Sequence, residues 1–433
     1  MSRPLQNASL ALLAAVVLGI SACGGGGNNS SSPPPAPACI SQAVLGTPQT
    51  ASGNVAPITV DGGPVVGNAL AGTINQAYTS VTVCAPGTSN CQTIDHVWVD
   101  TGSYGLRLMC TPFVATLPPS QQGGTTVANC GQFVSSYIWG AVRTADVKIG
   151  GESASSIPFQ VIGDAAVPAT APSTCSSQGS AQNTVSALGA NGILGIGVFR
   201  EDCGPGCAAP NLAPFGWYYT CPGGNCQPVN VVTGLQLQNV VGHFATDNNG
   251  SLIQLPALTA AGAATAAGSL IFGIGTQANN ALGSAMVFAA NPATGYIQTS
   301  TPFGDLTEPA SYIDSGSNAY FFNNSSLTQC TGTAAGLYCP AAATPLTATM
   351  LPFDTSTNPA SFTYNFSIAN IASSPNLAFN NVGGPSGTCN NTSGPPCTFA
   401  WGLSFFYGRN VYTALDMTTI GTNTGPFFAA TTP

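Results

Sequence analysis

The sequence predicts an all-β protein made of two related lobes with a cleft between them. Short runs of β-branched and aromatic residues recur along the chain, separated by turn-forming residues. Its 433 residues include 52 Gly and 34 Pro, a composition that suits many short strands joined by tight turns. One Asp-Gly motif occurs twice, about half a chain length apart. The length is sufficient for two fused lobes, each with its own core.

Strands are expected wherever apolar runs are bounded by Gly, Asn, Asp or Pro. The clearest runs are Val97–Val99, Ala145–Ile149, Phe159–Ile162 and Leu270–Phe272. The Ala-rich stretch from Leu258 to Ala267 is interpreted as one or two helical turns, although its Gly and Thr residues disfavour a helix.

The repeated motif is the most informative feature of the sequence. Val99-Asp100-Thr101-Gly102-Ser103 recurs as Ile313-Asp314-Ser315-Gly316-Ser317. Each copy is followed, at a similar distance, by two apolar residues and a glycine, which is Gly195 in the first half and Gly402 in the second. A single Asp-Thr-Gly is usually only a turn. Two copies with matched later glycines indicate two structurally equivalent lobes.

From about Gly67 to Gly421 the chain resembles the pepsin-like aspartic proteases. Val97–Ser103 is similar to the first active-site strand of that family, and Ser311–Ser317 is similar to the second. Further similar segments are Gly192–Gly195, Gly268–Gly273 and Phe405–Asp416. The resemblance implies a bilobal fold with an N-terminal lobe over residues 59–230 and a C-terminal lobe over 231–433.

The resemblance also implies that Asp100 and Asp314 are a catalytic pair. Two carboxylates a few ångströms apart share one proton, as in pepsin, which is the type case. The ionised member then accepts a proton from water, and the protonated member polarises the substrate carbonyl. The flanking residues are expected to support the two loops. Gly102 and Gly316 allow tight turns, Thr101 and Ser315 bond across the lobe junction, Ser103 and Ser317 donate to the carboxylates, and Gly195 and Gly402 lie beneath the loops.

The hairpin that would close over a substrate departs from the family pattern. Its counterpart is the segment from Phe133 to Gly140. Aligning Trp139-Gly140 on the family's Tyr-Gly pair requires a shortened hairpin, whereas the full-length alignment places Phe133 there and Tyr137 near the tip. Phe133, Tyr137 and Trp139 are therefore candidate substrate-binding residues. The alternative is an aromatic strand that packs on the core.

Charge and composition exclude several other functions. Only 5% of the residues are charged, against about 25% in ordinary soluble proteins. Six Lys and Arg against fourteen Asp and Glu give a net charge of −8, which argues against nucleic-acid binding. The two histidines, His96 and His243, lie in no nucleophile motif, and no Cys-x-x-Cys pair suggests zinc. We expect no metal or organic cofactor.

The N-terminus resembles a bacterial lipoprotein signal. Residues 1–22 contain Arg3 and then an apolar stretch, and Ala22-Cys23 ends a lipobox-like sequence. Cys23 is the expected lipidation site, and residues 23–58 form the expected Gly-, Ser- and Pro-rich tether. The alternatives are an ordinary cleaved signal peptide and a membrane-spanning helix, for which the apolar run is too short. Because Gly24 is not an Asp, the resemblance to lipoprotein signals implies the outer membrane, with the protein facing the periplasm or the cell surface.

The cysteines also indicate export. The chain has fifteen, and an acylated Cys23 leaves an even number, compatible with complete pairing in an oxidising compartment. The sequence alone does not determine the connectivity. Short separations favour Cys84–Cys91, Cys110–Cys130, Cys203–Cys207, Cys221–Cys226, Cys330–Cys339 and Cys389–Cys397, which leaves Cys39 and Cys175. The signal, the low charge and the cysteines also resemble a family of proteobacterial lipoproteins with a domain of unknown function.

Three functions remain open. The first is an acid-leaning endopeptidase that acts on extended polypeptide, as a monomer anchored to the membrane by its lipid. The second is a non-catalytic binding or scaffold lipoprotein that holds a protein partner in the same cleft. The third is an envelope structural or adhesion protein, suggested by the abundance of Asn, Ser, Thr and Gly.

Overall fold

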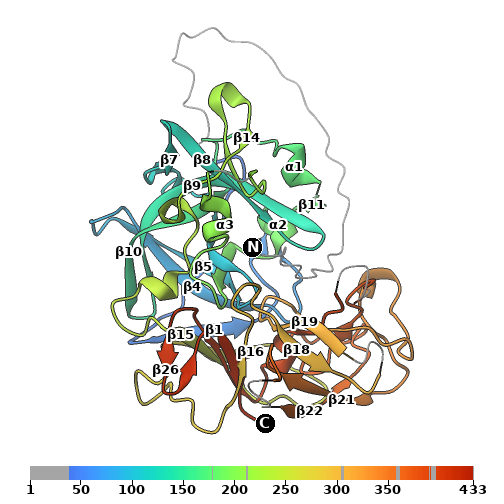
Figure 1. Ribbon diagram of the computed structural model, residues 1–433. Helices are drawn as coiled ribbons and strands as arrows, with labels where there is room; N and C mark the ends of the chain where they lie inside the picture. Colours follow the sequence, from blue (N-terminus) through green and yellow to red (C-terminus); the bar gives the residue numbers. More distant parts are fainter. Residues whose placement is uncertain are drawn as a thin grey trace, which may run out of the picture.

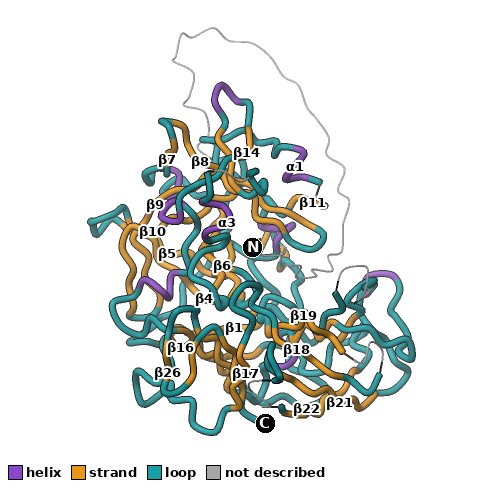
Figure 2. Tube along the Cα trace, in the orientation of Figure 1, coloured by secondary structure: helices purple, strands orange, loops and turns teal. Residues whose placement is uncertain are grey.

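The computed structural model describes residues 39–432 except 178, 211–212, 304–306, 357–360, 390 and 392–395. The predicted signal peptide, Cys23 and the first part of the predicted tether lie outside the described residues. Strands and loops dominate what is described, and helical segments are short (Figure 2). The described α-helices are α1 (Ser173–Ser176), α2 (Val185–Leu188) and α3 (Pro205–Ala208). No helix in these ranges is long and apolar enough to cross a membrane.

The first half of the chain forms an all-β lobe. Its two longest strands, β9 and β10, pair antiparallel, and β8 and β4 also pair with β9. The strands of this half are β2 (Val65–Val66), β3 (Ala69–Leu70), β4 (Ala77–Cys84), β5 (Cys91–Asp100), β6 (Tyr104–Met109), β7 (Gln121–Gln122), β8 (Thr125–Gln132), β9 (Ser136–Ile149), β10 (Glu152–Ile162), β11 (Ser180–Ala181), β12 (Gly192–Ile196), β13 (Tyr218–Thr220) and β14 (Gln227–Pro228).

A second sheet, in the latter half of the chain, carries the repeated motif again. Among the described residues it has seven strands in the order β22-β21-β18-β19-β24-β20-β23. Their bounds are β18 (Ile297–Ser300), β19 (Thr307–Ile313), β20 (Tyr320–Phe321), β21 (Thr344–Leu351), β22 (Phe362–Ile368), β23 (Gly383–Gly384) and β24 (Ala400–Trp401). Figure 1 shows these orange and brown strands apart from the blue and green strands of the first half.

An antiparallel layer joins the beginning and the end of the described chain. Its strands pair in the order β1-β16-β15-β25-β28-β17. They are β1 (Val55–Val60), β15 (Gly250–Gln254), β16 (Ala266–Phe272), β17 (Met286–Ala289), β25 (Asn410–Ala414) and β28 (Phe427–Ala430), beside the small hairpin β26 (Thr419–Ile420) and β27 (Asn423–Thr424). Because β1 also pairs with β4, this layer is continuous with the first lobe. The two-lobed, all-β architecture predicted from the sequence is confirmed.

The predicted tether reaches residue 58, but the structure shows folded chain before that point. The described residues from 39 to 58 are attached to the first lobe and do not form a free linker. Cys39 is bonded to Cys110, and the backbone of Val44 exchanges two hydrogen bonds of 2.9 Å with the Asn191 side chain. β1 then begins at Val55, inside the predicted tether. Alternating burial along β1, which a composition-based prediction overlooks, explains why this segment is structured.

The predicted strands are confirmed, and the predicted helical turns at 258–267 are wrong. The four apolar runs lie in β5, β9, β10 and β16. The stretch from Leu258 is a loop that leads into β16 at Ala266. Gly262 adopts φ +74°, a left-handed conformation that interrupts a helix. This turn therefore overrides the helical propensity of the alanines.

Seven disulfides form among the described residues, and five of them are the predicted short-range pairs. The predicted Cys110–Cys130 pair is wrong. Cys110 bonds Cys39, and Cys130 bonds Cys175 across 45 residues of sequence. Folding brings these distant cysteines together, and their separation in the sequence gives no indication of it. A protein with this many disulfides is extracytoplasmic, because thiols stay reduced in the cytosol.

Candidate active site

The two repeated aspartates lie at the ends of equivalent strands. β5 ends at Asp100, and β19 ends one residue before Asp314. Behind the first, β12 runs parallel to β5 and pairs Gly195 with Asp100. Behind the second, β24 runs parallel to β19, and the Asp314 amide donates to the Trp401 carbonyl at 3.0 Å. Each aspartate is thus supported by a second strand from its own half of the repeat.

The later glycines of the repeat are required by close packing under the loops. A Cβ atom added at Gly195 would lie 2.7 Å from the backbone nitrogen of Tyr104. A Cβ atom added at Gly402 would overlap the carbonyl oxygen of Ala319 and lie 2.6 Å from that of Ser317. Real Cβ atoms do not approach so closely, and only glycine fits at these positions.

Reciprocal hydrogen bonds join the two loops. The Thr101 amide donates to Ser315 Oγ at 3.1 Å, and the Ser315 amide donates to Thr101 Oγ1 at 2.9 Å. Each hydroxyl also donates into the opposite strand, Thr101 to the Ile313 carbonyl at 3.1 Å and Ser315 to the Val99 carbonyl at 2.8 Å. Four buried bonds therefore hold the loops in register across the lobe junction.

The same local bonds orient each carboxylate. The Gly102 amide donates to Asp100 Oδ1 at 2.7 Å, and the Gly316 amide donates to Asp314 Oδ1 at 2.7 Å. Ser103 Oγ donates to the other Asp100 oxygen, and Ser317 Oγ donates to Asp314 Oδ2 at 2.7 Å. Each carboxylate therefore accepts two local hydrogen bonds, one from a loop amide and one from a serine hydroxyl, and these fix its orientation.

The two carboxylates lie close together across the junction. A Cβ atom added at Gly102 would lie 2.5 Å from Asp314 Oδ1, and one added at Gly316 would overlap the carboxylate of Asp100. Each loop glycine thus leaves the space that the opposite carboxylate occupies. Burial of Asp314, and then the negative charge of Asp100 together with a hydrogen bond to it, raise the pKa of Asp314 well above its usual value. Its bonds from Ser317 and Gly316 oppose this rise. The pair is suited to share one proton.

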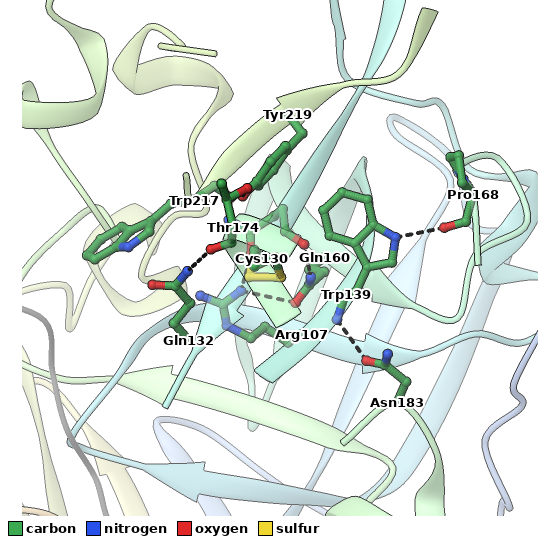
Figure 3. The surroundings of a disulfide bond; sticks show 12 residues. Arg107, Cys130, Gln132, Trp139, Gln160, Pro168, Thr174, Asn183, Trp217 and Tyr219 are labelled. Atoms are coloured by element: carbon green, nitrogen blue, oxygen red, sulfur yellow. Dashed lines mark hydrogen bonds between the residues drawn. A yellow bond between two sulfur atoms is a disulfide. The ribbon is translucent and has the colours of Figure 1, made fainter. Parts of the chain in front are cut away.

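Of the three flap candidates, Phe133 lies at the tip of the β8–β9 hairpin, and Tyr137 and Trp139 share one face of it. Phe133 is at the tip, where its amide donates to the Ser136 carbonyl at 2.9 Å, and it packs against Trp98 and Ile138. Phe133 and Asp100 line the same small cavity. Trp139 faces the other way, and its indole donates to the Pro168 carbonyl at 2.8 Å (Figure 3). Tyr137, two residues away on the same face, packs with the Cys130–Cys175 cluster. The structure brings Phe133 alone of the three beside Asp100.

Two cavities flank the aspartates. The larger, of about 280 Å³, is lined by both lobes and includes Trp98 and Gly316 from the two active-site segments. Its described lining contains no charged residue and is rich in Gly, Ala, Ser and Thr. The smaller, of about 50 Å³, is lined by Asp100 and Ser103 and by two charged residues, Arg107 and Asp202.

Arg107 and Asp202 were missed by the sequence interpretation. The available signal was an isolated charged residue in the apolar strand Tyr104–Met109 of a chain with only six Lys and Arg. Trp98 and Trp217, which line the larger and the smaller cavity respectively, were also missed. Their assignment depends on the direction in which each side chain points, which one sequence does not show.

Neither histidine lines either cavity. His96 Nδ1 lies 2.5 Å from Asp95 Oδ2 and His96 Nε2 lies 3.4 Å from Asp61 Oδ2, and these hydrogen-bonded carboxylates raise the pKa of His96 to about 9. His243 Nε2 lies 2.9 Å from Gln238 Oε1, and burial lowers its pKa. In the part of the chain that the structure describes, no group of three or more His, Cys, Asp or Glu side chains forms a metal site.

The fold and the paired aspartate loops define a two-lobed β protein in which two repeated Asp-Gly loops meet at the junction of the lobes. The chain belongs to the family DUF3443, described as "Protein of unknown function", whose family model matches residues 50–430. No curated protein matches the sequence. Among solved structures, the aspartic proteinase from Irpex lacteus is similar at a TM-score of 0.48 and 16% identity, over 87% of this chain and 96% of that chain.

Proposed function

We propose that this protein is an aspartic-type endopeptidase that hydrolyses peptide bonds through Asp100 and Asp314. The observation that supports the proposal most directly is the pair of reciprocally bonded loops, which hold two carboxylates against each other with every supporting hydroxyl and glycine in place. A loop kept only as scaffold would not need a carboxylate on both sides of the junction.

The chemistry follows from a dyad that shares one proton. The ionised carboxylate takes a proton from a water molecule, whose oxygen bonds to the peptide carbonyl carbon. The protonated carboxyl polarises the carbonyl oxygen and transfers its proton to it, which gives a neutral tetrahedral diol. The C–N bond then breaks, the nitrogen gains a proton from one carboxyl, and a hydroxyl proton of the diol passes to the dyad as the new acid forms.

The cavities support an extended polypeptide as the substrate. A peptide that lies across the dyad would place one side chain in the cavity of about 280 Å³, whose described lining is uncharged. A charged side chain would lose its hydration there without gaining a partner, so an uncharged side chain is favoured. We expect the peptide backbone to hydrogen-bond to the β8–β9 hairpin.

The location completes the proposal. Signal removal before Cys23, acylation of that cysteine and attachment to the outer membrane would place a monomeric enzyme in the periplasm or at the cell surface, near unfolded envelope polypeptides. Intact mass of the membrane-extracted protein tests this, because acylation adds the mass of the lipid. A Cys23→Ala variant should lack that mass and appear in the soluble fraction.

The experiment that tests the activity is cleavage of an unfolded protein substrate between about pH 3 and 7. Wild type is compared with Asp100→Asn and Asp314→Asn, and circular dichroism establishes that all three are folded. Cleavage by wild type that either substitution abolishes is the expected result. Absence of cleavage by folded wild type at every pH would refute the proposal.

One observation favours the non-catalytic alternative. Phe133 at the hairpin tip is only 8% exposed and already packs on the core, and the cavity next to Asp100 measures only about 50 Å³. A hairpin held in this way would close poorly over a substrate, although the larger cavity stays available to a bound peptide. Peptide binding by wild type without cleavage would support this second function.

A further inference from the structure

A buried arginine lies just after the first aspartate loop. Arg107, on β6, is 6% exposed and belongs to a chain with only six Lys and Arg. Its Nη1 donates to Asn129 Oδ1 at 2.5 Å. The same nitrogen donates to Gln160 Oε1 at 3.1 Å (Figure 3). Asn129 is on β8, a strand of the β8–β9 hairpin. The guanidinium is therefore held by residues from β8 and β10, two strands that pair with β9 from either side.

The counter-ion of Arg107 is Asp202, which lies just beyond β12. Arg107 Nη2 is 3.5 Å from Asp202 Oδ2, and the Tyr218 hydroxyl donates to Asp202 Oδ1 at 2.6 Å. Both charged residues line the small cavity that Asp100 also lines. Burial lowers the pKa of Arg107, while the negative charges of Asp202 and Asp100 favour its cationic form. The cation and the Asp100 carboxylate therefore stabilise each other electrostatically.

A second buried pair in the same lobe shows that such pairs also occur away from the aspartates. Arg143 Nε lies 2.5 Å from Asp164 Oδ2, and Arg143 Nη1 donates to the Leu117 carbonyl. This pair lines neither cavity. A buried ion pair costs desolvation and often adds little to stability compared with apolar residues of the same volume. The Arg107–Asp202 pair differs from it in lining the small cavity beside Asp100.

We propose that Arg107 and Asp202 are positioning residues that set the pH range in which Asp100 and Asp314 share one proton. The inference rests on the proposed function. The Arg107 cation favours negative charge on the dyad, and the Asp202 carboxylate partly cancels that field. The balance of the two determines how acidic the solution must become before the dyad takes up its second proton.

Few other titratable groups face the dyad and this pair. From β19, Tyr312 is buried, and burial raises its pKa well above the usual value. From β13, Tyr218 is likewise buried with a raised pKa. Both phenols are neutral in the acidic range. Among the described residues that line the small cavity, the charged side chains are therefore Arg107, Asp202 and Asp100 of the dyad.

The test is the pH profile of kcat/KM for two variants with opposite effects. Asp202→Asn keeps the shape of the side chain and removes its negative charge, so the profile should move to lower pH by about one unit. Arg107→Met removes the cation, so the profile should move to higher pH by about one unit. Arg107→Lys should stay closer to wild type than Arg107→Met.

The matched control is Asp164→Asn, which alters the second buried pair in the same way. Its pH profile should remain that of wild type even if its stability falls. Since a purely structural role would lower activity without moving the profile in opposite directions, unchanged profiles for both Asp202→Asn and Arg107→Met would overturn the inference. If Arg107→Met fails to fold, Asp202→Asn alone decides the matter.

The inference and the proposed function fail in distinguishable ways. If folded wild type cleaves nothing, the endopeptidase proposal fails, and the dyad can still be titrated by ¹³C NMR of Asp-labelled protein. The carboxyl signals that disappear in Asp100→Asn and Asp314→Asn identify the dyad. Their titration midpoints should fall in Asp202→Asn and rise in Arg107→Met, and midpoints that do not move would refute the role of the pair.

Discussion

The two aspartate loops share their hydrogen bonds and differ in their surroundings. Asp314 is completely buried, while Asp100 is 6% exposed and lines a cavity with Arg107 and Asp202. Around the second loop the core is aromatic, with Trp401 packed edge-on against Phe405 at 5.0 Å between ring centroids. The repeat therefore produces near-symmetric geometry, and the residues packed behind each loop make the electrostatics of the two lobes unequal.

The largest effect expected is the loss of cleavage when either aspartate of the pair is replaced. Asp100→Asn and Asp314→Asn each remove one member of the proton-sharing pair. We expect each to lower kcat by about 10²–10⁴-fold or more, the contribution of a general acid or base. Steady-state cleavage assays on folded protein measure it, with the remote Asp164→Asn as the control. Equal activity of wild type and one of the two variants would show that only one aspartate is used.

The pH dependence of stability should reveal the electrostatic difference between the two loops, because Asp314 is the more deeply buried aspartate. Because the pKa of Asp314 is raised in the folded state, its contribution to stability is fully present below the unfolded value near 3.8 and is lost as pH rises through the folded value. Asp314→Asn removes this loss, so its Tm should exceed that of wild type near pH 7 and approach it near pH 3. Thermal unfolding across that range measures the difference. A constant gap between the two curves would contradict it.

Removing either of the two reciprocal hydrogen bonds between Thr101 and Ser315 should destabilise the protein by a similar amount. Thr101→Val leaves the Ser315 amide without the acceptor that it contacts at 2.9 Å, and Ser315→Ala does the same to the Thr101 amide. Each substitution should lower the free energy of unfolding by about 1–3 kcal/mol, the cost of an unsatisfied buried group. Urea titrations of both variants measure this. A large loss of unfolding free energy in one variant and none in the other would show that only one of the two bonds stabilises the lobe junction.

The smallest effect concerns a charged cluster found in the first lobe. Hydrogen bonds that His96 donates to the carboxylates of Asp61 and Asp95 raise the pKa of His96 to about 9, so its contribution to stability is present below pH 6.5 and is lost as pH rises through 9. His96→Gln should destabilise the protein by about 1 kcal/mol at pH 6, since the partly exposed cluster is screened by solvent. Above pH 9.5 the two proteins should have the same stability. Unfolding at both pH values tests it, and a loss at high pH alone would contradict the stated cause.

Much of the site was accessible to sequence reasoning because it is local. Asp100, Gly102 and Ser103 lie within one turn, and their counterparts at Asp314 repeat the spacing, so the bonds of each loop follow from its own motif. The short disulfides were accessible for the same reason: Cys203 and Cys207 are four residues apart and need only a turn to meet. A duplicated pattern also implies two lobes, since each copy requires its own supporting strand.

Features that depend on long-range contacts were decided by the tertiary structure. Cys39 meets Cys110 across 71 residues, because the segment before β1 packs on the first lobe. Phe133 and Trp139 are both aromatic residues of the same hairpin. Because side chains alternate between the two faces, Phe133 lies beside Asp100 and Trp139 points toward Pro168. Arg107 lines the small cavity beside Asp100 because β6 lies between β10 and β12. Local patterns specify turns and repeats, whereas the charge around a site depends on which distant side chains the packed lobes bring to it.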